Sequence, residues 1–251
     1  MTTAPTTSSA PAITVSATAQ EVDAGGSANV LFNREAYQAC LKVAEDLVKR
    51  HMAQYDPSHD WAHVERVRNT AVRIAAGLPG VDMKVVELAA LFHDVAAKYT
   101  SSSTLRDTLA PFLNHPLTAA SLTHAQVFNI LDIVPCVSWT AEKTLRAKNE
   151  WTERHGAWLE LHAVQDADRL DAIGAIGIMR CSAFGAVKGR LLVDDGEGEG
   201  SSEAHFEEKL FLIKDRMKTD FGKAEAERRH STMKAWMEAL QAEKQVCTTM
   251  E

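Results

Sequence analysis

Histidine and aspartate side chains lie within the most apolar segments of this sequence, where their burial is costly. The pair His93-Asp94 directly follows the apolar run of residues 88–92, and His63 lies in the preceding apolar helical pattern. A buried carboxylate must be paired or bound to a metal ion. Imidazole nitrogens combined with carboxylate oxygens suit Mn²⁺, Fe²⁺, Co²⁺, Ni²⁺ or Zn²⁺ better than Ca²⁺. The residue types therefore predict a divalent metal centre.

A second acidic pair, Asp168 and Asp171, lies in another mostly buried segment, residues 164–179. A spacing of three residues places both carboxylates on one helix face, and two like charges there need an explanation. Asp168 would complete a set of two imidazoles and two carboxylates around one ion. For Asp171, an ion pair with Arg169 or Lys188 is an equally good explanation.

The elements that must hold these residues are helices. Apolar residues recur at three- and four-residue steps from residue 33 onward, and the alternation typical of strands is almost absent. Capping residues mark the expected helix starts, namely Asn33, Ser58 or Asp60, Asp82, and Thr123 with Gln126. Adjacent helical residues point roughly 100° apart, so His93 and Asp94 can share an ion only if their helix ends beside them. The predicted fold class is all-α.

The chain divides into one domain and two polar segments. A single domain is expected over residues 33–244, with a last helical region from residue 204 onward. Residues 1–30 are rich in Thr, Ser, Ala and Pro and contain no Lys or Arg, which predicts a disordered tail without a targeting signal. The acidic Gly/Ser stretch at residues 194–202 is too polar to pack and is expected to be a mobile loop.

Composition excludes several classes of protein. The formal charge of −7 and the pI of about 5.8 give no support for binding a nucleic-acid polymer, which needs many cationic contacts to phosphates. No run approaches the roughly 18 apolar residues of a membrane span. The four cysteines lie far apart and form no Cys-x-x-Cys pair, which is typical of reduced thiols. A soluble, cytoplasmic protein is therefore expected.

The order of His63, His93-Asp94 and Asp168 resembles the pattern that names the HD superfamily. The resemblance extends to a bacterial and fungal subfamily of hydrolases over about residues 35–242. The similar segments are Ser58 to Val67, Glu87 to Val95, Gln165 to Gly177, and the C-terminal pieces His205 to Leu210, Lys214 to Met217 and Arg228 to His230. Two segments depart from the family pattern, because the acidic loop looks longer and the tail before Asn33 looks additional.

The resemblance implies an HD-domain helical bundle in which His63, His93, Asp94 and Asp168 hold one divalent metal ion. Mn²⁺ is favoured, and Fe²⁺, Co²⁺, Ni²⁺, Zn²⁺ or Mg²⁺ are alternatives. It also implies a phosphohydrolase that acts on a small phosphorylated molecule, with nucleoside triphosphate cleaved to monophosphate and pyrophosphate. A metal ion suits this chemistry because it lowers the pKa of bound water from about 15.7 towards ~7.

Other residues are expected to handle protons and phosphate. Candidates for proton transfer are His59, Asp60, Glu87 and Asp171. Asp60 and Asp171 rank first, since each lies three residues from a predicted ligand. Candidates for neutralising the substrate phosphate are Lys98, Lys188 and Arg190.

Two other functions fit the same pattern. One is an HD-fold oxygenase with two iron ions, whose second site would need residues such as His115 and His124. The other is a non-enzymatic ligand sensor stabilised by its metal. Cleavage of cyclic dinucleotides is disfavoured because no Gly-Tyr-Pro follows the His-Asp pair.

Overall fold

The computed structural model describes residues 24–95, 104–194 and 200–247. Within these ranges every regular element is a helix, which confirms the all-α prediction. The longer helices are α1 (Ala24–Met52), α2 (Trp61–Ala75), α3 (Met83–Phe92), α7 (His124–Ile133), α8 (Trp139–Ala147), α10 (Leu159–Asp171), α11 (Gly174–Val187) and α13 (Asp220–Cys247). The short helices are α4 (Leu105–Thr108), α5 (Ala110–Leu113), α6 (Pro116–Ser121), α9 (Glu153–Ala157) and α12 (Ala204–Glu208). Four 3₁₀ turns join them, namely η1 (Pro57–His59), η2 (Val134–Cys136), η3 (Leu210–Leu212) and η4 (Lys214–Arg216).

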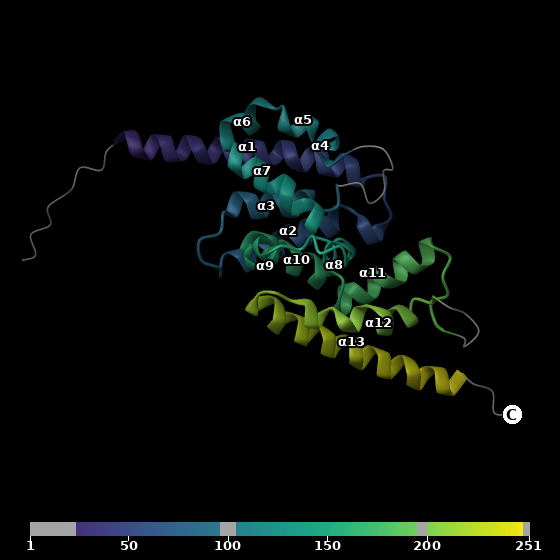
Figure 1. Cartoon of the computed structure of the whole chain (residues 1–251). Coiled ribbons are helices and arrows are strands. Elements are labelled where there is room, and N and C mark those ends of the chain that lie inside the picture. The colour runs from purple at the N-terminus through teal and green to yellow at the C-terminus, as the bar shows by residue number, and fades with distance from the viewer. Residues whose placement is uncertain (1–23, 96–103, 195–199, 248–251) are drawn as a thin grey trace, which may run out of the picture.

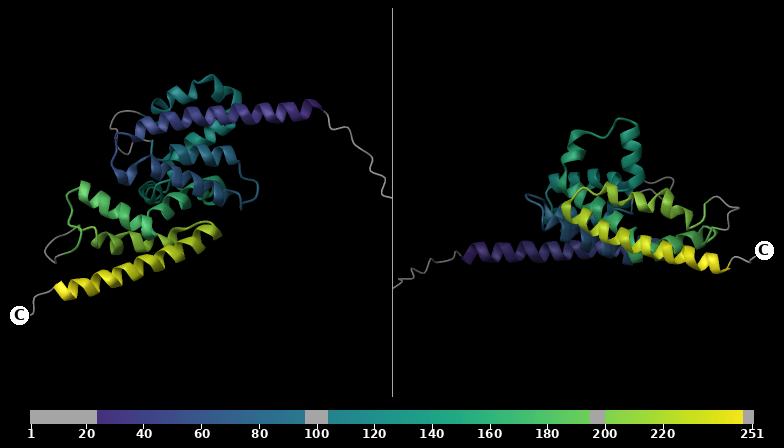
Figure 2. Two further views of the ribbon diagram at one scale, coloured as in Figure 1. Left: turned by 180° about the vertical axis from the view of Figure 1, so that it is seen from behind. Right: turned by 90° about the horizontal axis from the view of Figure 1, so that it is seen from below.

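The helices form three layers (Figure 1). The middle layer contains α2, α3 and α10. Helix α2 packs against both α3 and α10, and α10 also contacts α3. Helix α1, with α5 and α6 against it, covers one side, and α11 to α13 cover the other. Figure 2 (left) shows the same arrangement from behind, with α1 and α13 on opposite sides of the middle layer. The predicted metal ligands all come from this layer.

Capping residues begin two helices of the middle layer, α2 and α3, where the sequence predicts. The Asp60 carboxylate accepts a hydrogen bond from the His63 backbone N–H at 2.9 Å and starts α2. The Asp82 carboxylate accepts from the backbone of Lys84 and starts α3. Helix α3 is apolar on almost every side, and its residues 85–92 are buried except for Glu87. Its end at Phe92 leaves His93 and Asp94 at the last turn, as predicted.

A sharp bend separates α10 from α11, although the sequence suggests one continuous segment over residues 164–179. The two helix axes meet at 69°. Gly174 begins α11 with φ +77°, a conformation that side chains other than glycine rarely adopt. A β-carbon at Gly177 would lie only 2.3 Å from the carbonyl oxygen of Ala172. The glycines therefore allow α10 to end at Asp171 and α11 to fold back beside it.

The C-terminal layer is attached to α10 by a buried carboxylate. The predicted helix over residues 204–244 is interrupted by η3 and η4, and α13 begins only at Asp220. Asp166 of α10 accepts hydrogen bonds from the backbone N–H groups of Lys218 and Thr219 and from the Thr219 hydroxyl, at 2.7 to 3.1 Å. A β-carbon at Gly222 would lie 2.2 Å from an Asp166 carboxylate oxygen. The start of α13 is thus fitted closely to α10.

Two predicted boundaries differ from the structure. Helix α1 begins at Ala24, so Asn33 is not its N-cap and residues 24–30 are helical although they were expected to be disordered. Residues 1–23 of the predicted tail and residues 195–199 of the predicted loop lie outside the described residues. The end of that loop is packed, because Ser201 and Ser202 are buried and the Ser202 N–H donates to the Leu191 carbonyl.

Among the described residues, no single helix has the length and apolar character needed to cross a membrane. Helices α10 and α11 together have the length and apolar composition of a span, but they are bent by 69° relative to each other.

Candidate metal centre

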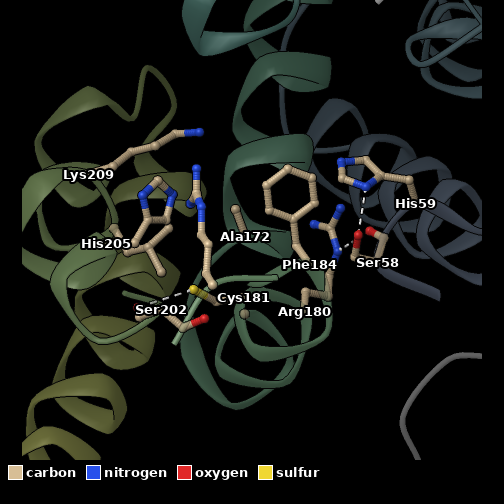
Figure 3. Close-up of a pocket in the computed structure, with 12 residues that line it drawn as sticks. Ser58, His59, Ala172, Arg180, Cys181, Phe184, Ser202, His205 and Lys209 are labelled. Carbon is tan, nitrogen blue, oxygen red and sulfur yellow. Dashed lines mark hydrogen bonds between the residues drawn. The ribbon is translucent and has the colours of Figure 1, made fainter. Parts of the chain in front are cut away.

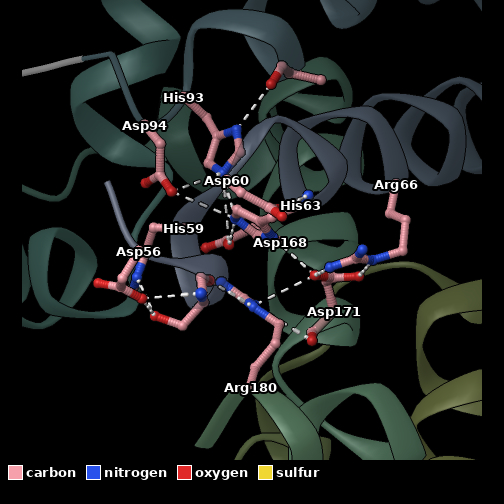
Figure 4. A network of polar contacts seen from close by, with 12 residues as sticks. Asp56, His59, Asp60, His63, Arg66, His93, Asp94, Asp168, Asp171 and Arg180 are labelled. Carbon is pink, nitrogen blue, oxygen red and sulfur yellow. Dashed lines mark hydrogen bonds and ion pairs between the residues drawn. The ribbon is translucent and has the colours of Figure 1, made fainter. Parts of the chain in front are cut away.

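Two histidines and two aspartates converge on one point between α2, α3 and α10 (Figure 4). The Nε2 atoms of His63 and His93 lie 3.2 Å apart. An Asp94 carboxylate oxygen is 3.3 Å from His63 Nε2 and 3.6 Å from His93 Nε2. An Asp168 oxygen lies 3.8 and 3.7 Å from the same nitrogens. Donor atoms that share an ion at about 2.0–2.2 Å lie roughly 3 to 3.6 Å apart, so His63, His93 and Asp94 fit a metal ion, and the Asp168 oxygen lies slightly farther out.

The second nitrogen of each imidazole fixes the ring so that Nε2 faces the common point. His93 Nδ1–H donates to the carbonyl oxygen of Ala90 at 2.7 Å, within its own helix turn. His63 Nδ1–H donates to a carboxylate oxygen of Asp171, also at 2.7 Å. Both hydrogen bonds leave the Nε2 lone pair available to a cation, which is the usual arrangement of metal-binding histidines.

Asp171 is held as a carboxylate by two arginines. Arg66 Nε donates to one Asp171 oxygen at 2.7 Å and its Nη2 to the other at 3.0 Å, and Arg180 lies 3.3 Å away. Burial alone would raise the pKa of Asp171, but the hydrogen bonds from His63 and Arg66 and the charge of Arg180 hold that pKa well below its usual range. Asp171 therefore stays ionised, and its carboxylate orients the His63 ring.

This network corrects the predicted ion pairs of Asp171. Its partners are Arg66 and Arg180, whereas Arg169 pairs with Glu142 at 2.5 Å and Lys188 lies over the ring of Phe184. Arg180 also donates to the backbone carbonyl of Ser58 and so ties α11 to η1.

The surrounding carboxylates favour positive charge at the site. Burial by itself would lower the pKa of His63, but its hydrogen bonds to Asp171 and Asp94 raise that pKa above the usual value. The same field that stabilises an added proton stabilises a metal ion, since both are cations. The types of donor atom and the local charge therefore both favour a cation at this point.

Three cavities lie in series around this point. The central cavity, about 110 Å³, is lined by His63, Asp94 and Asp168. It shares His59, Ala172, Arg180 and Lys209 with a second cavity of about 210 Å³, here named the cationic cavity (Figure 3). It shares Asp94, Ser138 and Thr140 with a third, the wide cavity, of about 490 Å³. A ligand longer than one phosphate can therefore extend in two directions from the metal centre.

His59 is the proton-transfer candidate that lines both the central and the cationic cavity. Its Nδ1 lies 2.7 Å from Ser58 Oγ, and the Ser58 hydroxyl in turn donates to the Asp56 carboxylate (Figure 4). Burial would raise the pKa of Asp56, but the hydrogen bonds from Ser58 lower it. The chain from His59 to a carboxylate fixes the ring and supports a positive charge on it.

Two other proton-transfer candidates have structural partners. Asp60 caps α2 through the His63 N–H. Glu87 accepts from Arg68 at 2.6 and 2.9 Å and from the Tyr37 hydroxyl at 2.8 Å, and it lines none of the three cavities. Glu87 therefore joins α3 to α1 and α2, and the structure gives it no contact with the metal centre.

The three predicted phosphate-binding residues differ in position. Lys98 lies outside the described residues. Lys188 is exposed and contacts the Phe184 ring at 5.4 Å from its centre. Arg190 lines the cationic cavity, with its guanidinium 5.7 Å from the centre of the same ring.

Sequence reasoning missed four residues of the site. These are Arg66, Arg180, Ser58 and Lys209. The position of Arg66 carried a signal, because it lies three residues after His63 just as Asp171 lies three residues after Asp168. Arg180 carried none, because its position depends on the bend at Gly174.

The residues expected for a second metal ion are elsewhere. Among the described residues, the cluster of three or more ligand-type side chains that converges within 4.8 Å is His63, His93 and Asp94. His115 caps α6 by accepting from the Leu117 N–H, and His124 is exposed at the start of α7.

Comparison with known proteins places this geometry in a family. The HD domain family matches residues 60–173, which include all four predicted ligands. The uncharacterized protein YpgQ of Bacillus subtilis (strain 168) is 34% identical over 204 residues, which cover 80% of this chain and 93% of YpgQ. The crystal structure of B. subtilis YpgQ in complex with ADP is similar, with a TM-score of 0.61, 31% identity, and coverage of 80% of this chain and 97% of that one. An HD-superfamily hydrolase from Bacillus thuringiensis gives a TM-score of 0.63 at 31% identity, over 84% of this chain and 98% of the other. The chain belongs to the HD domain family.

Proposed function

We propose that this protein is a metal-dependent phosphohydrolase that cleaves nucleoside triphosphates to monophosphates and pyrophosphate. The observation that carries the proposal is the common orientation of His63 and His93, whose Nδ1 atoms are both engaged so that both Nε2 atoms face Asp94 and Asp168. A divalent ion held by these four residues would supply a Lewis acid that activates water and polarises a phosphoryl oxygen. Mn²⁺ is the ion we favour for this mixed donor set.

The remaining residues of the site orient the metal ligands or bind the phosphoryl group. Asp171 holds the His63 ring, and Arg66 and Arg180 keep Asp171 ionised. Arg180 and Lys209, which line both the central and the cationic cavity, offset negative charge on a phosphoryl group there. Positioning and charge stabilisation together account for most of the catalysis of phosphoryl transfer.

His59 is the group that we assign to proton transfer. It lies where the central and cationic cavities meet, and its Nδ1 is engaged by Ser58. A protonated His59 can donate from Nε2 to a leaving oxygen, while the chain through Ser58 to Asp56 stabilises the charged ring. This role separates His59 from Asp60 and Asp171, whose carboxylates are occupied in capping and in orienting His63.

A nucleotide substrate has support from the comparisons. B. subtilis YpgQ, which is similar over 80% of this chain, was solved in complex with ADP. The wide cavity, at about 490 Å³, lies within the usual range of small-molecule sites, about 300–1,000 Å³. A cavity of this size beside the metal centre suits a nucleoside.

The decisive experiment is Asp94→Ala, with metal content and turnover measured on the same samples. We expect the purified wild-type protein to retain about one equivalent of divalent ion and to hydrolyse nucleoside triphosphates with added Mn²⁺. The variant loses both, because a ligand and a buried negative charge are removed. Asp215→Ala is the matched control, since Asp215 is exposed on η4. Circular dichroism verifies that both variants remain helical.

The bond cleaved is tested separately by separating the products. Release of pyrophosphate and a monophosphate supports cleavage between the α and β phosphates. Release of orthophosphate and a diphosphate contradicts that part of the proposal. An Asp94→Ala protein with full metal content and wild-type turnover contradicts the metal centre itself, and metal retention without turnover of any nucleotide leaves a ligand sensor as the better explanation.

A further inference from the structure

The cationic cavity gathers several basic side chains. Arg180 and Lys209 line it together with His59 and His205 (Figure 3), and Arg190 lines it as well; among the residues that the structure describes, no Asp or Glu lines it, and Glu208 lies 3.6 Å from His205. The chain as a whole carries a formal charge of −7, so this is a local exception. Cations gathered in a concave site raise the local concentration of anions.

His205 lies beside two of these basic side chains and has a pKa below its usual value. His205, at the wall of the cationic cavity, has a lowered pKa because it is partly buried and because Lys209 and Arg190 repel added positive charge, which outweighs the nearby Glu208. The direction of this shift agrees with the basic side chains that line the cavity.

The wide cavity has a different character. Its walls are Val134, Pro135, Ala141 and Leu145, with the hydroxyl groups of Ser138 and Thr144 among them. Its charged lining residues away from the metal ligands, Lys148 and Glu150, have opposite signs. Apolar walls with a few neutral polar groups are typical of sites for uncharged ring systems.

Phe184, which lines the cationic cavity, already contacts one imidazole and two basic side chains. His59 meets the Phe184 ring edge-on at 5.7 Å between ring centres, and Lys188 and Arg190 lie 5.4 and 5.7 Å from the ring centre. Within the described part of the chain, this ring is the aromatic carbon ring that lines the cavity, and two cations already lie over it. An anion is therefore the better occupant of the cationic cavity, and a nucleoside of the wide cavity.

From this order of cavities we infer the direction in which a nucleoside triphosphate binds. The nucleoside occupies the wide cavity, the α-phosphate lies in the central cavity, and the β- and γ-phosphates lie in the cationic cavity against Arg190 and Lys209. The inference rests on the proposed function and assigns its leaving-group site. Arg190 is thus a residue that selects substrates with a pyrophosphate leaving group.

The assignment gives a balanced reaction. The oxygen of water forms a bond to the α-phosphorus, and the bond from that phosphorus to the α–β bridging oxygen breaks. The electron pair of that bond stays on the bridging oxygen, which leaves as part of pyrophosphate. His59, at the junction of the two cavities, donates a proton to this oxygen and is restored by the proton that water releases. The products are a nucleoside monophosphate and pyrophosphate.

Calorimetric titration of the metal-loaded protein with inorganic pyrophosphate and, separately, with adenosine monophosphate tests the assignment. Arg190→Met keeps an apolar chain beside Phe184 and removes the charge, whereas Thr144→Trp fills the wide cavity from the exposed face of α8. We expect Arg190→Met to weaken pyrophosphate binding about five- to tenfold and to leave the monophosphate unchanged. Thr144→Trp should do the reverse. Lys143→Met, an exposed lysine that lines none of the three cavities, is the control for loss of surface charge.

The outcomes separate this inference from the proposed function. If Arg190→Met weakens the monophosphate and spares pyrophosphate, or changes neither, the binding direction is wrong. If nucleoside triphosphates are hydrolysed to pyrophosphate without this dependence on Arg190, only the leaving-group site fails. If no nucleotide is hydrolysed but the two variants still separate pyrophosphate from monophosphate binding, the proposed function fails and the assignment of the two cavities stands. Melting temperature and metal content verify that each variant is folded and loaded.

Discussion

Asp171→Asn tests whether this carboxylate orients a metal ligand or transfers a proton. Asn has nearly the shape of Asp and keeps one oxygen acceptor, so it can still receive a hydrogen bond from His63 Nδ1. It removes the negative charge that Arg66 and Arg180 contact at 2.7 to 3.3 Å. If orientation is the role, metal affinity falls. If proton transfer is the role, metal affinity stays and the maximal rate falls.

The expected magnitude follows from the contacts. A charge-assisted hydrogen bond is worth about 1.5–3 kcal/mol, and loss of a partner that orients a metal ligand lowers affinity about 10- to 100-fold, which corresponds to roughly 1.4–2.7 kcal/mol. Asn retains an acceptor, so we expect a weakening near tenfold. The fold also loses stability, but Arg66 is 35% exposed and water replaces part of its lost partner, so about 1–2 kcal/mol is expected.

The assay is a Mn²⁺ titration of chelator-stripped protein, followed by calorimetry and by turnover at each Mn²⁺ concentration. Wild type and Asp171→Asn should reach similar rates once Mn²⁺ is saturating, with the curve of the variant displaced to higher concentration. Asp168→Asn is the comparison, because it changes a ligand directly. Unchanged Mn²⁺ affinity combined with a large loss of rate at saturation would refute the orienting role and restore Asp171 as a proton-transfer group.

Two further predictions concern stability. Gly222→Ala should destabilise the protein by about 1–3 kcal/mol in urea unfolding, because its β-carbon would lie 2.2 Å from an Asp166 oxygen; an unchanged unfolding midpoint would show that α13 shifts without cost. Burial would raise the pKa of Glu142, but Lys218 and Arg169 lower it to about 2. The ionised Glu142 therefore stabilises the fold above its unfolded pKa near 4.5, and this contribution is lost as the pH falls towards 2. Between pH 6 and pH 3 the wild type should therefore lose about 2 kcal/mol more unfolding free energy than Glu142→Gln, and equal losses would mean that the ion pairs are screened.

The parts of the fold that could be predicted from sequence are those set by local interactions. Asp60, Asp82 and Thr123 begin their helices because their side chains accept backbone hydrogen bonds within three residues. The end of α3 beside His93 and Asp94 follows from the same periodicity. The prediction of the four metal ligands needed the family resemblance in addition to this periodicity.

The parts that could not be predicted depend on contacts between distant segments. A glycine within an apolar helical run is tolerated often enough that Gly174 and Gly177 did not reveal a 69° bend. Without that bend Arg180 has no predictable partner, and the role of Asp171 stays open between a proton-transfer group and an anchor for His63. The early start of α1 was also missed, because Gly25 and Gly26 weaken the expectation of a helix there.

The position of α8 has a consequence for how substrate preference can diverge among related proteins. None of its residues is fully buried, yet Ala141, Thr144 and Leu145 form a wall of the wide cavity. Thr144 is exposed, and substitutions at exposed positions usually change stability by less than about 0.5 kcal/mol, so they can accumulate there without threatening the fold. Arg180 has no such freedom, because a change there disturbs Asp171 and, through it, the orientation of His63. Under the proposed function, we therefore expect related proteins to differ in the nucleoside that they accept while retaining the same metal centre.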